Sequence, residues 1–343
     1  KILVIQKTPQ ANAGNDATIC ETNTHTLNGE IVNAANSIWS TSGDGTFSST
    51  NTLTPVYTPG ANDIIAGNVT LTLTASAISP CQVASSDTKT LVIQKLPQAN
   101  AGSDATICQT STIVLAGSAS NAGNVLWSTS GDGSFSSASS LAPVYTPGIN
   151  DINSGLVTLT LTASAIAPCQ VASSDSKILV IQKAPFANSG NDATICQTET
   201  HTLSGNASNY SNILWTSSGN GTFTSTSSLT TVYTPGSSDI NNGTVTLTLT
   251  AVAISPCAVS AADTKTLIIQ KLPTVNAGAD ATICQTATHT LSGTAANQSA
   301  VQWTTSGNGT FSSSNSLATV YTPGNTDRSE EHTSELQSRL HLV

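Results

Sequence analysis

The sequence predicts an all-β protein built as a tandem array of two-sheet sandwich domains with an 88-residue repeat. Trp39, Trp127, Trp215 and Trp303 are each 88 residues apart, and cysteine, tyrosine and proline landmarks keep the same step. A period of this size indicates a small domain copied along the chain. Only 8% of residues are charged, Met is absent, and Ser, Thr, Asn and Gly fill the polar positions, a composition that disfavours helices. Function is therefore expected in the repetition and the surface before any single site.

The period divides the chain into successive repeats. Residues 1–8 are expected to be the last strand of a preceding repeat, because KILVIQK matches the closing segments at 90–95, 178–183 and 266–271. Repeats 1, 2 and 3 then span 9–96, 97–184 and 185–272, and a truncated repeat 4 spans 273–327. Residues 328–343 leave the pattern and resemble a translated sequencing adapter, so we expect a non-native tail. The whole is expected to be an interior fragment of a longer protein.

The strand signals occur in the same order in every repeat. DATIC (16–20) and HTLNG (25–29) are expected to form an opening pair, and the segment around Trp39 a central strand. The Gly43-Asp44-Gly45 step that follows favours a tight hairpin turn, with Phe47 on the second arm. LTPVYTPG (53–60) predicts another short strand that ends in a Pro-Gly turn.

Two longer strands are expected to close each repeat. VTLTLTA (69–75) alternates apolar residues with threonine, which predicts a half-buried strand with Val69, Leu71, Leu73 and Ala75 on one face. KTLVIQK (89–95) is the last strand, and its lysines are expected to protect an exposed sheet edge from aggregation. About seven strands per repeat suit a β-sandwich. Short proline-containing joints then predict a semi-rigid, elongated chain of domains.

The motif set resembles a known type of repeat. NAG-x-DATIC, L-x-G, W-x-(T/S)-S-G-(D/N)-G-(T/S)-F, VYTPG-x-x-D, VTLTLTA, and PC followed by SD resemble the PKD-like, immunoglobulin-like tandem repeats of large secreted bacterial cell-surface adhesins of the gliding-motility-associated type. The resemblance covers residues 1–327 and implies an immunoglobulin-like (PKD-like) β-sandwich array exported to the cell surface. One departure is that the W-D-F-G-D-G core of PKD domains appears here as W-S-T-S-G-D-G.

Seven cysteines recur with the repeat. Repeats 1 to 3 each hold two cysteines 61 residues apart, and repeat 4 holds only Cys284. One disulfide per small domain suits an oxidising compartment, which predicts the pairs Cys20–Cys81, Cys108–Cys169 and Cys196–Cys257. In an immunoglobulin-like strand order the first cysteine ends an opening strand and the second follows the penultimate strand, an order that leaves a bridge between repeats, from Cys81 to Cys108, and free thiols as the alternatives.

Catalysis and metal binding find weak support in the sequence. The tryptophans Trp39, Trp127, Trp215 and Trp303 are expected to be core residues of the central strand. His25, His201 and His289 recur, but repeat 2 has Ile113 there, and no G-x-S-x-G elbow is present, so no enzymatic role is expected. Asp63, Asp151 and Asp239 are weak calcium candidates, although no D-x-D-x-D-G loop occurs and such residues more often bond their own turns. No other cofactor is expected.

The sequence therefore predicts a non-catalytic, secreted or cell-surface segment that acts as an elongated stalk or spacer, with surface glycans, other cell-surface proteins and its own neighbouring repeats as partners. The alternatives are a multivalent glycan-binding array and an accessory array of a secreted enzyme whose catalytic domain lies elsewhere. The net charge of −9 disfavours nucleic acid, which needs clustered Lys and Arg. No run of residues is apolar and long enough to span a membrane.

Overall fold

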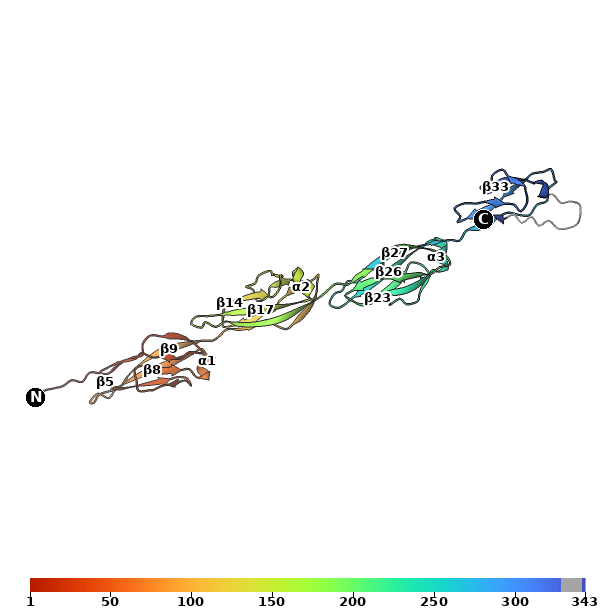
Figure 1. Ribbon diagram of the computed structural model, residues 1–343. Helices are drawn as coiled ribbons and strands as arrows, with labels where there is room; N and C mark the ends of the chain where they lie inside the picture. Colours follow the sequence, from red (N-terminus) through yellow and green to blue (C-terminus); the bar gives the residue numbers. More distant parts are fainter. Residues whose placement is uncertain (328–340, 343) are drawn as a thin grey trace. The chain divides into compact units, whose positions relative to one another are not determined.

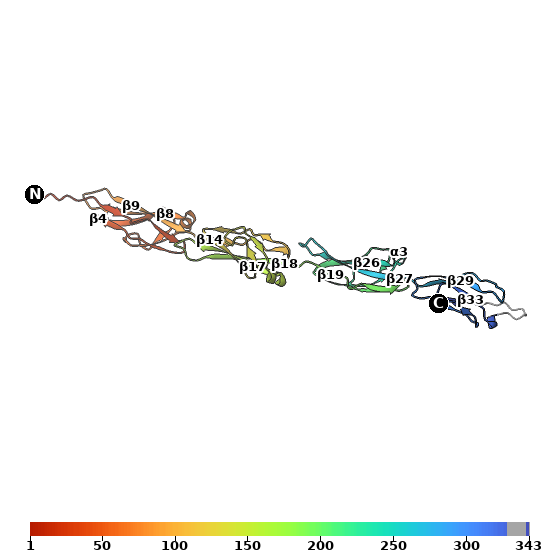
Figure 2. The ribbon, with the colours of Figure 1, turned by 90° about the horizontal axis from the view of Figure 1, so that it is seen from above.

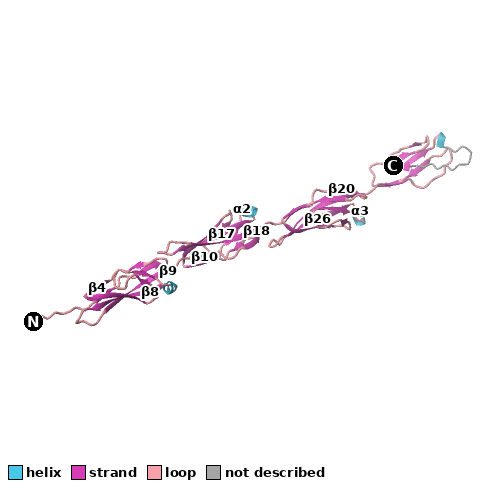
Figure 3. Cartoon of the chain, turned by 60° about the horizontal axis from the view of Figure 1, so that its bottom comes forward, coloured by secondary structure: helices cyan, strands magenta, loops and turns pink. Residues whose placement is uncertain are grey.

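The computed structural model describes residues 1–327 and the backbone of 341–342, so most of the adapter-like tail lies outside the described residues. The chain divides into two compact units, Lys1–Lys183 with Ser255–Cys257, and Ala184–Ile254 with Ala258–Val343. Repeats 1 and 2 lie in the first unit, and repeat 4 and most of repeat 3 lie in the second. Figure 1 shows that strands are the main regular element of each repeat, and Figure 3 picks out the few short helices among strands and loops.

The same order of elements recurs in the first three repeats. Repeat 1 contains β1 (Gln10–Asn12), β2 (Ala17–Cys20), β3 (His25–Thr26), β4 (Glu30–Val32), β5 (Ala34–Thr41), β6 (Thr46–Phe47), β7 (Val56–Thr58), α1 (Ala61–Ala66), β8 (Asn68–Ala77) and β9 (Ser85–Gln94). Repeat 2 contains β10 (Gln98–Asn100), β11 (Ala105–Cys108), β12 (Ile113–Val114), β13 (Ser118–Ser120), β14 (Ala122–Thr129), β15 (Ser134–Phe135), β16 (Val144–Thr146), α2 (Ile149–Ser154), β17 (Leu156–Ala165) and β18 (Ser173–Gln182).

The second unit continues the pattern. Repeat 3 contains β19 (Phe186–Asn188), β20 (Ala193–Cys196), β21 (His201–Ser204), β22 (Asn206–Ser208), β23 (Tyr210–Ser217), β24 (Thr222–Phe223), β25 (Thr230–Thr234), α3 (Ser237–Asn242), β26 (Thr244–Ala253) and β27 (Ala261–Gln270). Repeat 4 contains β28 (Thr274–Asn276), β29 (His289–Ser292), β30 (Thr294–Ala296), β31 (Trp303–Thr304), β32 (Thr310–Phe311), β33 (Ala318–Thr322) and the 3₁₀ helix η1 (Asn325–Asp327), and β34 (His341–Leu342) pairs with β31.

Each complete repeat is an immunoglobulin-like β-sandwich, which confirms the predicted fold class. In repeat 1 one sheet has the order β2-β9-β8-β5, and the other has β3-β7-β6 with the short pair β1-β4 beside it. Strands β5, β8 and β9 therefore correspond to C, F and G of the immunoglobulin fold, and β4/β3, β7 and β6 to B, E and D. Figure 2 shows β8 and β9 side by side in this repeat, where they pair antiparallel from Asn68↔Val92 to Ala75↔Ser85.

The core forms between the two sheets of each repeat. The alternation of VTLTLTA behaves as predicted, since Val69, Leu71, Leu73 and Ala75 are at most 2% exposed. Trp39 on β5 is 1% exposed and lies 6.4 Å, centroid to centroid, from Phe47, which in turn lies 4.9 Å from Tyr57. This cluster repeats around Trp127, Trp215 and Trp303. The tryptophans thus occupy the core positions predicted for them.

Three local predictions were wrong. Gly43 to Gly45 do not close a hairpin, because β6 pairs with β7 of the other sheet and not with β5. The opening segments β2 and β3 do not pair with each other, because β2 joins β9 and β3 joins β7. Residues 1–7 form no strand, and Ile2 to Ile5 are 81–91% exposed, because no described strand pairs with this segment as β2 and β8 pair with β9.

The short helices α1, α2 and α3 were not predicted. Each follows the Pro-Gly step, begins after Gly60, Gly148 or Gly236, and ends at a glycine with φ between 75 and 79°. Six residues leave no room for a hydrophobic periodicity, so the only sequence signals were the flanking glycines. None of the helices in the described part of the chain has the length and apolar character to cross a membrane.

Candidate functional site

The junctions between consecutive repeats carry the chain's disulfides. Cys20 ends β2, where it faces Gln94 at the end of β9 in the parallel ladder. Cys169 lies in the loop between β17 and β18 of repeat 2, and its sulfur is bonded to that of Cys20, with the Cα atoms 4.9 Å apart. Cys108 of repeat 2 is bonded in the same way to Cys257 of repeat 3, at 4.8 Å. Both bridges join cysteines 149 residues apart, one repeat further than the 61-residue spacing.

The predicted pairs Cys20–Cys81, Cys108–Cys169 and Cys196–Cys257 were therefore wrong, as was the alternative Cys81–Cys108. The reason is the position of the two cysteines along the sandwich. Cys20 faces Gln94, whereas the loop that holds Cys81 follows β8 at the end where Ala75 faces Ser85. Gln94 and Ser85 are nine residues apart on one strand, about 30 Å at 3.3 Å per residue, and a disulfide tolerates at most about 7 Å between Cα atoms.

Backbone groups at the junction are tied down by polar contacts from both repeats. Glu21 accepts a hydrogen bond from Leu96 N at 3.1 Å, and Asn121 Nδ2 donates to Leu96 O at 3.2 Å. Asn121 has φ 53°, a left-handed conformation that asparagine tolerates better than most residues. Asn209 and Asn297 make the same contact with Ala184 O and Leu272 O. The first joint is therefore bonded from both of its repeats, and each of the other two joints is bonded from the repeat that follows it.

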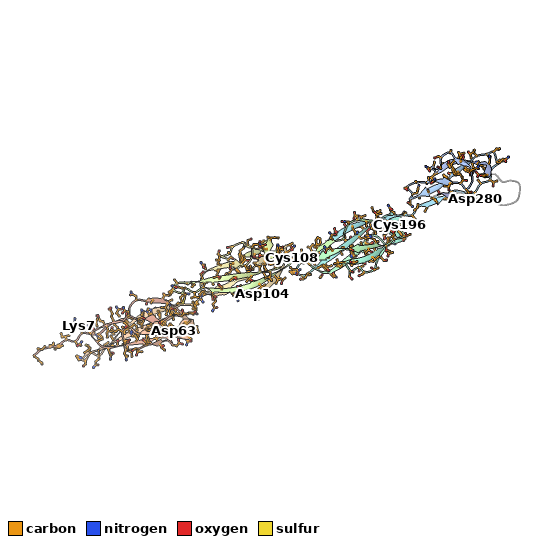
Figure 4. All side chains as sticks on the ribbon, viewed as in Figure 1. Lys7, Asp63, Asp104, Cys108, Cys196 and Asp280 are labelled. Carbon is orange, nitrogen blue, oxygen red and sulfur yellow. A yellow bond between two sulfur atoms is a disulfide. The ribbon has the colours of Figure 1, made fainter. Side chains whose placement is uncertain are left out.

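Three cysteines are unbonded: Cys81, Cys196 and Cys284. Cys196 ends β20 and faces Gln270, as Cys20 faces Gln94. The Cys81 sulfur lies 3.5 Å from Gln6 O, as Cys169 and Cys257 lie 3.3 and 3.4 Å from Gln94 O and Gln182 O. Figure 4 labels the bonded Cys108 and the unbonded Cys196, each at the end of a repeat.

The aspartates proposed as calcium candidates hold the sandwich closed. Asp63, labelled in Figure 4, lies in α1 and is 2% exposed. Its Oδ2 accepts hydrogen bonds from Tyr57 Oη at 2.6 Å and from the backbone of Gly45 and Gly60, each at 3.1 Å. A Cβ at Gly43 or Gly45 would collide with this carboxylate, which explains the Gly-Asp-Gly step better than a hairpin does. Asp151 and Asp239 are bonded in the same way.

The donors around these carboxylates are N–H and O–H groups, whereas calcium requires several oxygen ligands. Burial first, and then the hydrogen bond to the aspartate, raises the pKa of Tyr57, Tyr145 and Tyr233 to about 12. Burial opposes ionisation of Asp239, but the hydrogen bonds from Tyr233, Gly236 and neighbouring amides keep the pKa of this carboxyl below its ordinary value. Within the described residues, no three His, Cys, Asp or Glu side chains form a metal-binding group.

The other recurring aspartates also bond the backbone. Asp16 Oδ1 accepts from Thr90 N at 2.8 Å, and Asp87 Oδ2 accepts from Ala13 N at 2.7 Å. Their equivalents in repeats 2 and 3 make the same bonds. These bonds attach the N-terminal strands of a repeat to its last strand.

The edge-strand prediction for the lysines was wrong. Strand β9 lies inside its sheet, between β2 and β8, and Lys89 is only 6% exposed. Lys89 Nζ lies 3.2 Å from His25 Nε2, and Lys265 makes the same contact with His201. An ammonium group has only donors, so the imidazole accepts. Burial and the charge of Lys89 lower the pKa of His25, and burial lowers the pKa of Lys89 against the opposing effect of Asp16.

Comparison with known proteins adds little about function. No protein-family model and no curated protein matches the chain. Among solved structures it is similar to three immunoglobulin domains of titin in an E-to-A variant (14% identity, TM-score 0.48, 76% of this chain and 98% of that chain). It is also similar to extracellular cadherin domains 1–4 of protocadherin gamma B7 (12%, 0.47, 90% of both chains) and to domains 22–24 of mouse cadherin-23 (12%, 0.39, 77% and 99%).

Proposed function

We propose that the chain is a non-catalytic, load-bearing spacer in an extracellular protein, with the bacterial cell surface as its site. The observation that carries the proposal is the covalent bond between consecutive repeats, which adds a second link beside each peptide joint. Disulfides persist in oxidising, extracellular compartments. A bridge that joins two repeats contributes little to burying either core, and it restricts how far the two repeats separate when the chain is pulled.

The bridges also change the route that tension takes through the chain. In the first unit, a pull on both ends passes through residues 1–20, the Cys20–Cys169 bond and residues 169–183. If this bridge acted alone, the 148 residues between the two cysteines would lie inside the closed loop and bear no tension once that route is taut. At about 3.5 Å per extended residue, the bridged route reaches roughly 120 Å and the unbridged chain of 183 residues roughly 640 Å.

The second bridge overlaps the first, because Cys108 lies inside the Cys20–Cys169 loop and Cys257 lies outside it. The shortest covalent route through the chain runs from 1 to 20, back from 169 to 108, and on from 257 to 343. This route contains 169 of the 343 residues. When the core of one repeat unfolds, the chain therefore lengthens by less than the number of residues in that repeat implies.

Single-molecule pulling from both termini tests the proposal. Under oxidising conditions the fully extended chain should be about 600 Å shorter than after reduction, since 174 residues are withheld. The double variant Cys20→Ser/Cys108→Ser should reach the longer length without reductant. The double variant Cys81→Ser/Cys284→Ser, at two unbonded cysteines, is the matched control and should retain the shorter length. Equal lengths in oxidised and reduced wild-type protein would remove the load-bearing argument.

A second candidate, a multivalent adhesive surface, is favoured by one observation. The outward face of the four-stranded sheet carries an uncharged hydroxyl ladder, in which Thr70, Thr72 and Thr74 of β8 face Thr90, Thr88 and Ser86 of β9. Two of the three hydroxyl pairs recur on β17 and on β26, where Thr158 faces Ile178 and Thr250 faces Ala262 instead. Several weak sites on one chain gain avidity.

Binding to a glycan array tests this second candidate. Lysines at the centre of the ladder, in the triple variant Thr72→Lys/Thr160→Lys/Thr248→Lys, should abolish binding if the face is adhesive. The control places the lysines at the exposed positions Asn51, Ser139 and Ser227, away from the ladder. Absence of binding by the wild-type chain, or equal binding by both variants, would leave the spacer as the function.

A further inference from the structure

The two bridges show that an inter-repeat disulfide has a strand half and a loop half. The strand half is the last residue of the sequence Ala-Thr-Ile-Cys on β2 or β11, and the loop half follows Ile-Ala-Pro or Ile-Ser-Pro in the next repeat. The chain carries an unbonded strand half at Cys196 and an unbonded loop half at Cys81. The question is whether these residues are isolated thiols or complete half-sites.

The backbone around Cys196 matches that of the bonded strand halves. Ala193 to Cys196 pair in parallel with Leu267 to Gln270, as Ala17 to Cys20 pair with Leu91 to Gln94. The amide of the following residue, Gln197, donates to Gln270 O at 2.9 Å, as that of Glu21 donates to Gln94 O at 2.9 Å. The geometry that presents Cys20 to its partner is therefore already present at Cys196.

What differs at Cys196 is its exposure. Cys20 and Cys108 are 3% and 8% exposed, and Ile19 and Ile107, which precede them, are each 8% exposed. Cys196 and Ile195 are both half-buried. The hydroxyl of Thr198 lies 3.5 Å from the Cys196 sulfur, as Thr110 does at Cys108, and the bonds from Thr198 lower the pKa of the Cys196 thiol. A lower pKa enlarges the thiolate fraction that enters disulfide exchange.

The loop of Cys81 matches the bonded loops in the same detail. Cys81 N donates to Ile78 O at 2.9 Å, and Cys169 N donates to Ile166 O at 3.0 Å. The Cys81 sulfur already faces a glutamine carbonyl, Gln6 O, which belongs to a segment whose sequence ILVIQK is identical to residues 178–183. At the two bonded loops, the equivalent glutamines are Gln94 and Gln182. Each of them lies beside the strand cysteine of the bridge.

We propose that Cys196 and Cys81 are the two complementary halves of further inter-repeat disulfides. Cys196 takes the Pro-Cys loop of a repeat of this type that follows repeat 3, and Cys81 takes the strand cysteine of a repeat that precedes repeat 1. Each bond forms by oxidation of two thiols, which lose two protons and pass two electrons to a disulfide oxidant of the compartment. The register is always one repeat apart, so the array is linked without interruption. This inference holds whether the array is a spacer or an adhesive surface.

A chimera of the full chain tests Cys196. Residues 273–343 are replaced by a copy of residues 97–184, so that repeat 2 follows repeat 3 across the same Lys-Leu-Pro joint that it has after repeat 1. After oxidative production and alkylation with iodoacetamide, peptide mapping should show Cys196 bonded to the grafted copy of Cys169, with complete loss of alkylation at Cys196. Protection of Cys20 in the same molecule reports that oxidation and folding occurred.

Two further variants make the result decisive. The same chimera with serine in place of the grafted copy of Cys169 should restore full alkylation of Cys196. A second chimera, in which a copy of residues 240–272 replaces 328–343, completes repeat 4 instead and should also protect Cys196 while Cys284 remains alkylated. Alkylation of Cys196 in both chimeras while Cys20 is protected, or a bond between the grafted loop and the strand cysteine of its own repeat, would overturn the proposal.

Discussion

At the residue scale, the buried carboxylate of Asp63 joins its own neighbourhood in the sequence to a loop 18 to 20 residues earlier. It accepts hydrogen bonds from the Gly43–Gly45 loop, from Tyr57 in the middle of β7 and from Gly60 before α1. Hydrogen bonds to a charged group are stronger than neutral ones, and a buried donor left without an acceptor is costly. The aspartate therefore fixes the crossing between the two sheets.

Asp63→Asn should destabilise repeat 1 by roughly 2 kcal/mol, because an amide cannot accept all of these bonds. Hydrogen–deuterium exchange should be faster in peptides of β7 and α1, and unchanged in the same peptides of repeat 2, where Asp151 is intact. The exposed Asp44→Asn is the matched control, since repeat 3 already has Asn220 there and its Oδ1 accepts from Ser238 N at 3.0 Å. Equal effects of the two variants would contradict the role assigned to Asp63.

The Lys89–His25 contact should make repeats 1 and 3 sensitive to acid. The folded pKa of His25 and His201 lies below the unfolded value of 6.5, so the unfolded state binds the proton more readily. The stability is fully present above pH 6.5 and is lost as the pH falls through the folded pKa. Thermal melts between pH 7.5 and pH 4.5 should show a smaller loss for His25→Ile/His201→Ile than for wild type. Repeat 2, with Ile113, serves as the natural reference; identical pH profiles would exclude the contact as the cause.

At the element scale, the short helices depend on the glycine that ends them. Gly155 follows α2 with φ 77°, a left-handed conformation that costs a residue with a Cβ about 1–2 kcal/mol. Gly155→Ala should therefore lower the calorimetric transition of repeat 2 by about 5 °C or more. Gly123→Ala in the same repeat is the control, because the nearest atom to an added Cβ is 3.5 Å away and repeat 1 has Ala35 there. A shift of the same size in both variants would point to a cause other than φ.

The elements that sequence predicts well are those whose pattern reports burial directly. The alternation in β8 follows from one buried and one solvated face, and Trp39 belongs to a similar strand. The hairpin at Gly43 was mispredicted because Gly43 and Gly45 are required by the close approach of the Asp63 carboxylate, 18 to 20 residues later in the sequence. The lysine prediction failed because the parallel pairing of β2 with β9 brings together residues more than 70 positions apart. Such long-range partners leave no local signal.

At the scale of the whole molecule, the 88-residue period placed the cysteines in each repeat but could not predict which of them form disulfides with each other. Two cysteines per repeat permit bonds within a repeat or between neighbours, and only their placement at opposite ends of the sandwich selects the second. The same repetition gives the junction between repeats 1 and 2 and the junction between repeats 2 and 3 the same disulfide. The length that the chain reaches under load and its behaviour after cleavage at the joints are consequently properties of the linked array and not of a single repeat.

Cleavage with trypsin should reveal this linkage on a gel. Lys95, Lys183 and Lys271 directly follow the closing strands at the three joints, whereas Lys89, Lys177 and Lys265 are buried. After nicking at the joints, repeats 1 to 3 should migrate together without reductant, because Cys20–Cys169 and Cys108–Cys257 cross the cut sites. Reductant should convert this species to fragments of about one repeat each.

The same digest contains its own controls. The fragment that begins at Leu272 should separate without reductant, since Cys284 is unbonded. Cys20→Ser should free repeat 1 alone, while repeats 2 and 3 stay joined through Cys108–Cys257. Bonds within repeats, such as Cys20–Cys81, would instead release every repeat from the wild-type chain before reduction. The non-reducing lane therefore distinguishes a covalently linked array from a string of separately bridged domains.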